Sequence, residues 1–186
     1  NAKIAENPLI NIFVWGFFAI FAHSGFLSAQ GVKSYLQVSS EIGILAIGVT
    51  LLMISGEFDL SIGSLIGFSG MSVTLLTTET NLGMPLASIV TLIIVLFIGY
   101  CNGITVVKSG LPSFIITLGS LFVIRGITIA VSKIITGRTQ VSGLEESKGY
   151  GIMSTIFSNS FTISGTDFPI SILWWLFFGF FGYLLL

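Results

Sequence analysis

Residues 85–107 read PLASIVTLIIVLFIGYCNGITVV, 23 residues without a charged side chain. A helix needs about 20 such residues to cross a hydrocarbon core roughly 30 Å thick. Five other runs are also uncharged or nearly so: Pro8–Leu27, Leu36–Ser55, Leu60–Thr78, Pro112–Val131 and Pro169–Leu186. None alternates polar with apolar residues, as the strands of a membrane barrel would. The sequence therefore predicts an all-α, polytopic transmembrane bundle with about six helices.

Composition supports the same fold class. The chain is 53% hydrophobic and 8% charged, with a mean hydropathy of +1.02, whereas a soluble domain is about 25% charged. So few charges cannot cover a surface in water, and we expect the chain to contact membrane lipid. The net charge is −1 and Lys and Arg are not clustered, which argues against nucleic-acid binding. A single cysteine, Cys101, excludes an intrachain disulfide and a cysteine metal cluster.

Proline and glycine mark the edges and faces of the predicted helices. Four prolines stand near the starts of runs, where a missing N–H costs little: Pro8, Pro85, Pro112 and Pro169. Two glycine pairs have the GxxxG spacing that lets helix backbones approach closely: Gly63 with Gly67, and Gly99 with Gly103. We expect both pairs to be helix-packing positions.

Residues 136–168 separate the fifth and sixth runs and are polar and rich in glycine. Five charged side chains fall there, at Arg138, Glu145, Glu146, Lys148 and Asp167, so we expect this segment to lie in water. The sequence GYGIMSTIF within it fits either a short interfacial helix or a plain connecting loop. We predict a single transmembrane domain, 1–186, with an extramembrane loop at 136–168.

The stretch SGEFDLSIGS, residues 55–64, places two carboxylates between two apolar runs. Gly56 suits the left-handed position after a helix, and Asp59 is placed to accept a hydrogen bond from the N–H of Ser61 or Ile62 at the next helix start. A charge at mid-bilayer costs about 2.5–3.5 kcal/mol, so this turn should lie near headgroups or in a water-lined cavity. Glu57 and Asp59 fit both a capped surface turn and a transport pathway or gate.

Arg125 lies in the latter half of the run FIITLGSLFVIRGITIAVSK, far from its end. The side chain either snorkels toward the interface or needs a carboxylate or several carbonyl groups inside the bundle. Asp59, Glu57 and Glu41 are candidate partners. Structural pairing and direct contact with a transported substrate both fit the position.

Asn102, in GYCNG, is an amide inside the fourth run, where it either bridges helices or lines a path. The chain has no nucleophile placed with a base, no P-loop, no HExxH motif and no cluster of metal ligands. We therefore expect no catalytic residue and no metal site, and no cofactor bound by this chain.

Three motifs, in order, resemble a known family. SGEFDLSIGSLIGFSGM (55–71), GYCNGITVV (99–107) and LPSFIITLGSLFVIRGI (111–127) are similar to motifs of the permease subunits of bacterial sugar-type ABC importers, the ribose, xylose and galactose class. In that family the motifs usually run sGGiDLSvGs, GxxNGxlV and PSFIvTLGtlxixRG. The resemblance is close over Leu36–Gly126. One departure is Glu57, which replaces the second glycine of the first motif and puts the backbone geometry of the turn, or the sugar class, in question.

The resemblance implies a permease of about ten helices in the bacterial inner membrane, with this chain as its N-terminal portion, ending before the ATPase-docking loop. It implies three protein partners: a second permease copy in a dimer, a cytoplasmic ABC ATPase and a periplasmic sugar-binding protein. ATP and Mg would bind to the ATPase. The permease would move a monosaccharide into the cytoplasm by alternating access.

The orientation that the resemblance implies places 136–168 in the periplasm. With the N-terminus in the cytoplasm, five membrane crossings before residue 136 put this segment on the periplasmic side. The positive-inside rule favours the opposite orientation. In the orientation of the family, four basic residues would lie outside: Lys33, Lys133, Arg138 and Lys148. We expect the family topology to hold.

A neutral sugar needs groups that pair with hydroxyls more than it needs charges. We therefore name six candidate residues for the substrate pathway or its gate: Asn102, Ser113, Thr117, Glu57, Asp59 and Arg125. An alternative is a proton-coupled secondary transporter in which Glu57, Asp59 and Arg125 relay protons. The sequence does not distinguish a sugar from a nucleoside or an autoinducer as the substrate.

Overall fold

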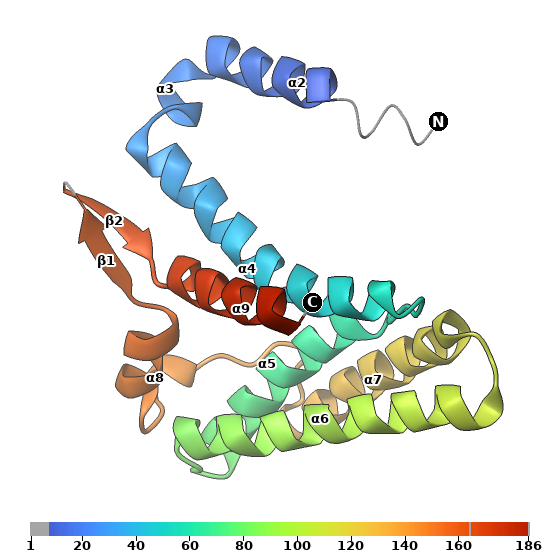
Figure 1. The fold of residues 1–186 in the computed structure, drawn as a ribbon. Coiled ribbons are helices and arrows are strands. Elements are labelled where there is room, and N and C mark those ends of the chain that lie inside the picture. The colour runs from blue at the N-terminus through green and yellow to red at the C-terminus, as the bar shows by residue number, and fades with distance from the viewer. Residues whose placement is uncertain (1–7, 164, 186) are drawn as a thin grey trace. The chain divides into compact units, whose positions relative to one another are not determined.

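The computed structural model describes residues 8–163 and 165–185 (Figure 1). Within these ranges the predicted all-α class is confirmed, with one small two-stranded sheet as an addition. The elements are α2 (Pro8–Phe21), α3 (His23–Phe26), α4 (Ala29–Ile54), α5 (Ile62–Glu79), α6 (Met84–Ser109), α7 (Ser113–Thr136), the 3-10 helix η1 (Leu144–Glu146), α8 (Tyr150–Phe157), β1 (Ser160–Ile163), β2 (Thr166–Pro169) and α9 (Ser171–Leu185). They form two compact units, one of residues up to Leu45 with Ser158–Leu185, the other of Ala46–Phe157.

Each of the six predicted runs is largely helical, although not all of them meet the length of a membrane span. Among the described residues, α4, α6 and α7 are long and apolar enough to cross a membrane. Helix α5 has 18 residues but ends in Glu79 and carries many hydroxyl groups, and α2 and α9 are apolar but shorter. The first run breaks after Phe21, and the last helix starts at Ser171 because Pro169 belongs to strand β2.

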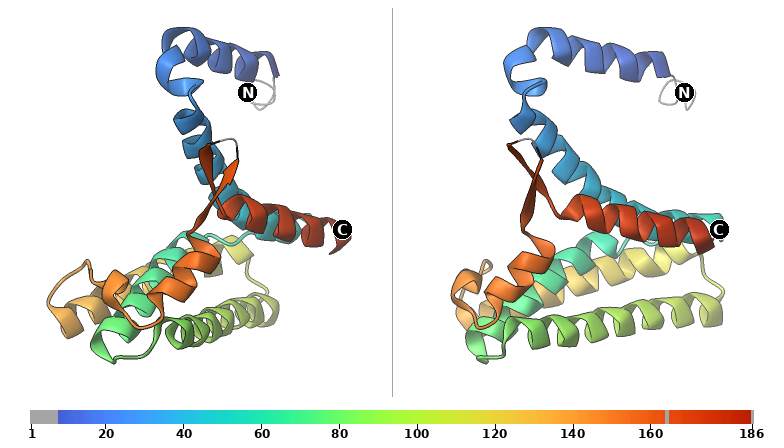
Figure 2. Two further views of the ribbon diagram at one scale, coloured as in Figure 1. Left: turned by 90° about the vertical axis from the view of Figure 1, so that its left-hand side faces the viewer. Right: turned by 60° about the vertical axis from the view of Figure 1, so that its left-hand side comes forward.

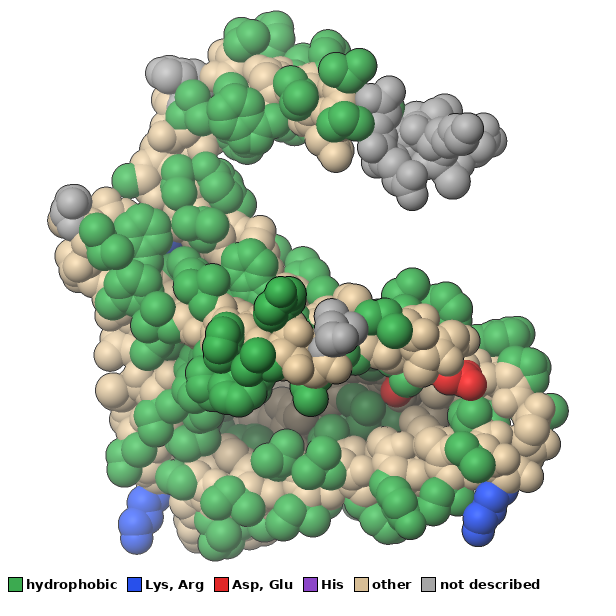
Figure 3. Space-filling model, in the orientation of Figure 1, with side chains coloured by type: hydrophobic (Ala, Val, Ile, Leu, Met, Phe, Trp, Pro, Cys, Tyr) green, Lys and Arg blue, Asp and Glu red, His purple; other side chains and the backbone are tan. Residues whose placement is uncertain are grey.

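The unit of residues 46–157 is built on three helices. Helix α5 contacts both α6 and α7, and α6 contacts α7 (Figure 2). The fully buried positions are mostly small, such as Ala87, Thr91 and Ser132, whereas large apolar side chains such as Phe97 are exposed. On the face drawn in Figure 3, hydrophobic side chains line α6, and Lys or Arg side chains lie near its two ends. This distribution suits helices that pack through small residues and face lipid outward.

One end of this unit is closed by residues of the predicted loop 136–168. The backbone N–H of Met84 donates to the carbonyl of Lys148 at 2.8 Å, and Ser132 Oγ donates to the carbonyl of Arg138 at 2.8 Å. Gly149 has a φ of +87°, and a Cβ there would lie 2.6 Å from Pro85 Cδ. The sequence GYGIMSTIF forms helix α8, so the helical alternative is correct and the plain loop is not.

The other unit contains a β-hairpin that the sequence analysis did not predict. Strands β1 and β2 pair antiparallel, with Phe161 opposite Phe168. Each strand has only four residues, too short a pattern to distinguish from a loop. In the same unit, helices α4 and α9 approach closely: Ser40 Oγ lies 2.7 Å from Ser171 Oγ, and a Cβ on Gly43 would lie 2.2 Å from Trp175 Nε1.

Candidate functional site

The turn between α4 and α5 begins with the glycine that the sequence predicted. Gly56 has a φ of +84°; its N–H donates to the Met53 carbonyl at 3.0 Å, and the N–H of Glu57 donates to the Leu52 carbonyl at 3.2 Å. These two bonds satisfy carbonyl groups that the end of a helix leaves without partners. The left-handed position of Gly56 is therefore confirmed.

Asp59 holds the start of the next helix. Its Oδ1 accepts a hydrogen bond from the backbone N–H of Ser61 at 2.7 Å and another from Ser61 Oγ at 2.6 Å. Ser61 is completely buried and stands immediately before α5, which begins at Ile62. The predicted hydrogen bond from the Ser61 N–H to Asp59 is thus present. The residue at the N-cap position of α5 is, however, Ser61 and not Asp59, and its side chain makes no capping bond.

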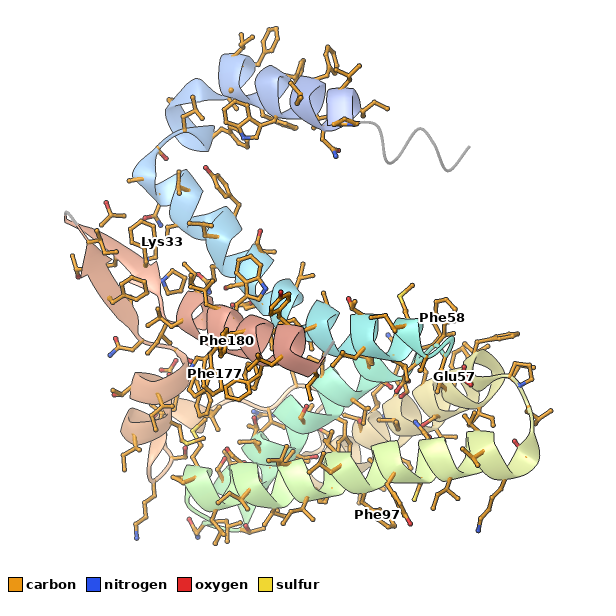
Figure 4. All side chains as sticks on the ribbon, viewed as in Figure 1. Lys33, Glu57, Phe58, Phe97, Phe177 and Phe180 are labelled. Atoms are coloured by element: carbon orange, nitrogen blue, oxygen red, sulfur yellow. The ribbon has the colours of Figure 1, made fainter. Side chains whose placement is uncertain are left out.

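Glu57 replaces a glycine of the family motif, and the backbone tolerates the change. Among the described residues, Asn81 is the only one other than glycine with a positive φ, so Glu57 occupies a conformation open to any residue. Figure 4 labels Glu57 and Phe58 at this turn. The Glu57 side chain is half-buried and forms no hydrogen bond or ion pair within the described part of the chain.

Two hydroxyl groups of α7 bind the backbone of this turn. Ser113 Oγ accepts a hydrogen bond from the N–H of Phe58 at 2.9 Å, and Thr117 Oγ1 accepts one from the N–H of Leu60 at 3.1 Å. Residues four apart on a helix share a face, as do N–H groups two apart in an extended segment. The spacing of Ser113 and Thr117 therefore matches that of the two N–H groups, and the turn lies along the first turn of α7.

Helix α6 contributes one more group. Asn102 Nδ2 donates to Ser61 Oγ at 3.2 Å, and Ser61 Oγ donates in turn to Asp59. We call Asp59, Ser61, Asn102, Ser113 and Thr117 the turn network. It joins the α4–α5 turn to α6 and α7 through side chains from three separate parts of the sequence.

The sequence analysis named four of these five residues as candidates for the substrate pathway or its gate, and it also offered a capped turn for Asp59 and a bridge between helices for Asn102. The hydrogen bonds of Asp59 and Asn102 fit those structural alternatives. The sequence analysis missed the Ser61 side chain, whose only signal was its position two residues after Asp59 at a helix start. The network contains hydrogen-bonding groups and no nucleophile with a base, so its chemistry is that of holding a backbone segment in place. Within the described ranges, no group of three His, Cys, Asp or Glu side chains is placed to hold a metal ion.

Arg125 lies apart from the turn network. It lines a groove of about 490 Å³ between α5 and α7, together with Gly63, Gly67, Leu121 and Ile129 among others. No hydrogen bond or ion pair joins its guanidinium to any described residue. The expected pairing with Glu57 or Asp59 is therefore not formed in this unit, and the other candidate, Glu41, accepts a hydrogen bond from Gln37 at 3.2 Å.

The two glycine pairs face open space. A Cβ built on Gly63, Gly67, Gly99 or Gly103 would meet no atom of the described residues within 4 Å. Neither pair is therefore covered by another helix of the unit 46–157, and their role in helix packing stays a prediction.

Comparison with known proteins identifies the family of this chain. Residues 31–186 match the family described as "Branched-chain amino acid transport system / permease component". The chain is 37% identical over 116 residues to the xylose transport system permease protein of Escherichia coli (strain K12), covering 62% of this chain and 30% of the relative. It is 34% identical over 143 residues to the xylose transport system permease protein of Haemophilus influenzae, covering 77% and 38%.

A third relative is an inner membrane ABC transporter permease protein of Escherichia coli (strain K12). It is 32% identical over 125 residues, which cover 67% of this chain and 38% of the relative. The matched segment thus spans 30 to 38% of the length of these relatives. No solved structure matches the chain.

Proposed function

Because the chain belongs to the family of permease components of branched-chain amino acid transport systems, we propose that it forms part of the membrane-spanning subunit of an ABC importer. It is a multi-pass protein of the inner membrane. Two of the relatives above are permeases of xylose transport systems. We propose a monosaccharide, and not an amino acid, as the substrate, and transport by alternating access into the cytoplasm.

The turn network is the observation that carries this proposal. Each of the three sequence motifs places residues in it: Asp59 and Ser61 from the first, Asn102 from the second, Ser113 and Thr117 from the third. Three motifs whose contributing residues span positions 59 to 117 thus meet at one site, at one end of the α5–α7 helices. A site assembled from three helices suits a transporter, in which helices move against each other around a substrate path.

The geometry favours a turn-holding role over a substrate-contact role for three of the candidates. Ser113 and Thr117 are buried, and each hydroxyl accepts a hydrogen bond from a backbone N–H, that of Phe58 or that of Leu60. The Asn102 amide donates to Ser61. A sugar could reach these groups only if the turn opened. We propose that Asn102, Ser113 and Thr117 hold the turn, and that the half-buried Glu57 carboxylate is the group at the turn that can meet a substrate.

Energy for import would come from outside this chain. We propose the partners of an ABC importer: a cytoplasmic ATPase that binds ATP and Mg, a periplasmic sugar-binding protein, and a second permease copy in a dimer. The residues described here contain no phosphate-binding motif, which is consistent with hydrolysis on a separate subunit.

The direct test uses the full-length permease with its ATPase and binding protein in proteoliposomes. Uptake of labelled xylose, other pentoses, hexoses and leucine is measured with and without ATP and the binding protein. We expect uptake of a monosaccharide that requires both and that a protonophore leaves unchanged. Uptake that a protonophore abolishes and an ATPase mutation leaves intact would select the proton-coupled alternative. Leucine uptake without sugar uptake would reject the substrate class.

A further inference from the structure

A polar pocket lies at the end of the α5–α7 helices that is opposite the turn network. Residues at the end of α5 form one wall and residues 142–148 form the other, among them Thr77, Thr78, Asn81, Ser142, Glu146 and Lys148. Helix α5 has 18 residues, so about 27 Å of helix separate this pocket from the turn at its start. Figure 1 shows the α5–α6 connection and α8 at one end of α6, and the α6–α7 connection at the other end.

Backbone hydrogen bonds hold the two walls of the pocket in place. Asn81 has a left-handed φ of +56°, and the N–H of Leu82 donates to the Leu76 carbonyl at 3.3 Å, so the chain turns sharply after α5. The N–H of Met84 donates to the carbonyl of Lys148 at 2.8 Å, which ties the second wall to the start of α6. Helix η1 of the second wall also contacts α5. Two segments far apart in the sequence thus form one pocket within the unit 46–157.

The side chains of this pocket have free donors and acceptors. The Asn81 amide, the Glu146 carboxylate and the Lys148 ammonium are exposed and form no hydrogen bond or ion pair within the described part of their unit. Thr77 and Thr78 donate their hydroxyl hydrogens to carbonyls of their own helix, so their oxygens remain acceptors. A ligand in the pocket would therefore meet a carboxylate, an amide, an ammonium and hydroxyl groups side by side.

The composition of the pocket favours one class of ligand. Its volume of about 490 Å³ falls within the range of about 300–1,000 Å³ for small-molecule sites. Such sites are usually lined mainly by apolar groups, whereas here Leu82 is the one large apolar side chain among the described lining residues. One carboxylate and one ammonium balance each other, so neither an anion nor a cation is favoured. A neutral, polyhydroxylated molecule suits this lining, because each of its hydroxyls both donates and accepts hydrogen bonds.

We propose that this pocket is a binding site for the monosaccharide at the periplasmic end of the permease. Glu146 accepts hydrogen bonds from sugar hydroxyls, Lys148 donates to them, and the Asn81 amide does both. The family topology predicted from the sequence puts residues 136–168 in the periplasm, so the sugar would meet this pocket before it reaches the turn network. The inference rests on the proposed function and adds to it a sugar site on this chain.

The first test measures uptake of labelled D-xylose by the full-length permease with its ATPase in proteoliposomes, at a saturating concentration of sugar-loaded binding protein. Glu146→Gln should lower the maximal rate about fivefold with unchanged Tm, because sugar hydroxyls lose a charged acceptor. Glu145→Gln is the matched control, since Glu145 is the exposed neighbour and does not line the pocket. We expect this control to transport at the rate of the unmodified permease.

The outcomes of this test separate the two proposals. If the unmodified permease takes up no monosaccharide, the proposed function fails. If it takes up D-xylose and Glu146→Gln does so at the same maximal rate, or if Glu145→Gln loses as much, only the sugar pocket is overturned. A change confined to the concentration of binding protein that gives half the maximal rate would place Glu146 on the binding protein and would also overturn the pocket.

The second test measures access to the pocket directly. In the full-length permease with its other cysteines replaced by serine, Cys101 included, Ser142→Cys is labelled with a membrane-impermeant maleimide. We expect labelling from the periplasmic face that D-xylose slows severalfold and that phosphate and leucine leave unchanged. Thr139→Cys is the control, because Thr139 is exposed in the same segment but does not line the pocket, and D-xylose should not alter its labelling.

Each contrary result of the labelling has a definite meaning. Failure to label Ser142→Cys would show that another part of the permease covers the pocket. Labelling that D-xylose does not slow would show that the pocket holds only water. Protection by phosphate or leucine in place of D-xylose would assign a different class of ligand. Any of these three results would overturn the proposal.

Discussion

Asp59 and Arg125 are charged groups of the same three-helix unit, but their surroundings differ. The Asp59 carboxylate accepts hydrogen bonds from Ser61 N–H and Ser61 Oγ, two residues along the chain. Arg125 lines the open groove between α5 and α7, is exposed, and makes no hydrogen bond or ion pair within its unit. The first charge is satisfied by its own turn, whereas the second has no local partner.

This difference separates charged side chains whose bonding partners lie in the same short motif from those whose partners do not. The hydrogen bonds between a carboxylate and the start of the next helix form as soon as the turn forms, because the donor and acceptor groups are neighbours in sequence. A guanidinium in mid-helix has no such bonding groups next to it in the sequence. The turn should therefore be sensitive to changes in its own hydrogen bonds. The following variants test that statement.

Asp59→Ala should have the largest effect. It leaves the N–H and hydroxyl of the buried Ser61 without their acceptor, and hydrogen bonds to a charged group contribute about 1.5–3 kcal/mol each. We expect a loss of about 3 kcal/mol in the free energy of unfolding and little residual uptake. Thermal unfolding in detergent and sugar uptake in proteoliposomes measure the two effects.

Asp59→Asn is the matched control for that variant, because its amide oxygen still accepts a hydrogen bond at nearly the same place. We expect it to keep most of the stability. If Asp59→Asn is as unstable as Asp59→Ala, the negative charge itself is required. If Asp59→Ala is as stable as the unmodified protein, the turn does not depend on this carboxylate.

Thr117→Val removes the acceptor of the Leu60 N–H while keeping the shape of the side chain. Leaving a donor unsatisfied costs about 1–3 kcal/mol when it is fully buried, and the Leu60 N–H is partly buried, so Tm should fall by a few degrees. Thr105→Val is the control: Thr105 is exposed and its hydroxyl bonds only the Cys101 carbonyl one turn back in its own helix. Equal shifts in the two variants would show that the bond from α7 to the turn contributes nothing measurable.

The sequence was sufficient to predict the helices and those features of the turn that depend on neighbouring residues. The lengths of the apolar runs located the helices. Gly56 has the local signature of a left-handed residue, and Asp59 that of an acceptor for the N–H groups at the next helix start. The bonds from Ser113 and Thr117 were not predictable in this way, because their partners are backbone N–H groups more than fifty residues away. Serine, threonine and asparagine near a turn fit a substrate path and a backbone clamp equally well until the helices are placed.

The same limit explains the Arg125 prediction. Charge type and position indicated that Arg125 either snorkels to the interface or needs a partner, and the candidate partners were Asp59, Glu57 and Glu41. The structure places Asp59 and Glu57 at the turn, about 18 Å along α7 from Arg125. Counting charges in a sequence gives the candidates, but identifying a partner requires the three-dimensional position of each carboxylate.

Gly56→Ala tests the backbone of the turn without touching its side-chain bonds. An L-residue in the left-handed conformation costs about 1–2 kcal/mol, and Gly56 has a φ of +84°, so the variant should be destabilised by about that amount. Gly48→Ala is a control for which we expect the opposite change in stability. Gly48 lies within helix α4 and a Cβ there meets no atom within 4 Å, so alanine should stabilise the helix by about 0.5–1 kcal/mol. Destabilisation by both changes would mean that a neighbouring helix covers Gly48.

Asn102→Ala should have the smallest effect on stability and separates two roles for this residue. It removes one neutral hydrogen bond of 3.2 Å, that from Nδ2 to Ser61 Oγ, worth about 0.5–1.5 kcal/mol. Ser61 keeps its stronger bond to Asp59, so the turn should persist and the variant should assemble. If Asn102 only holds the turn, uptake falls in proportion to the loss of stability, and Asn102→Gln restores neither, because its longer side chain does not fit the same bond. If uptake falls while Tm is unchanged, with a rise in KM that depends on the sugar used, Asn102 contacts the substrate. The turn network would then form part of the path itself.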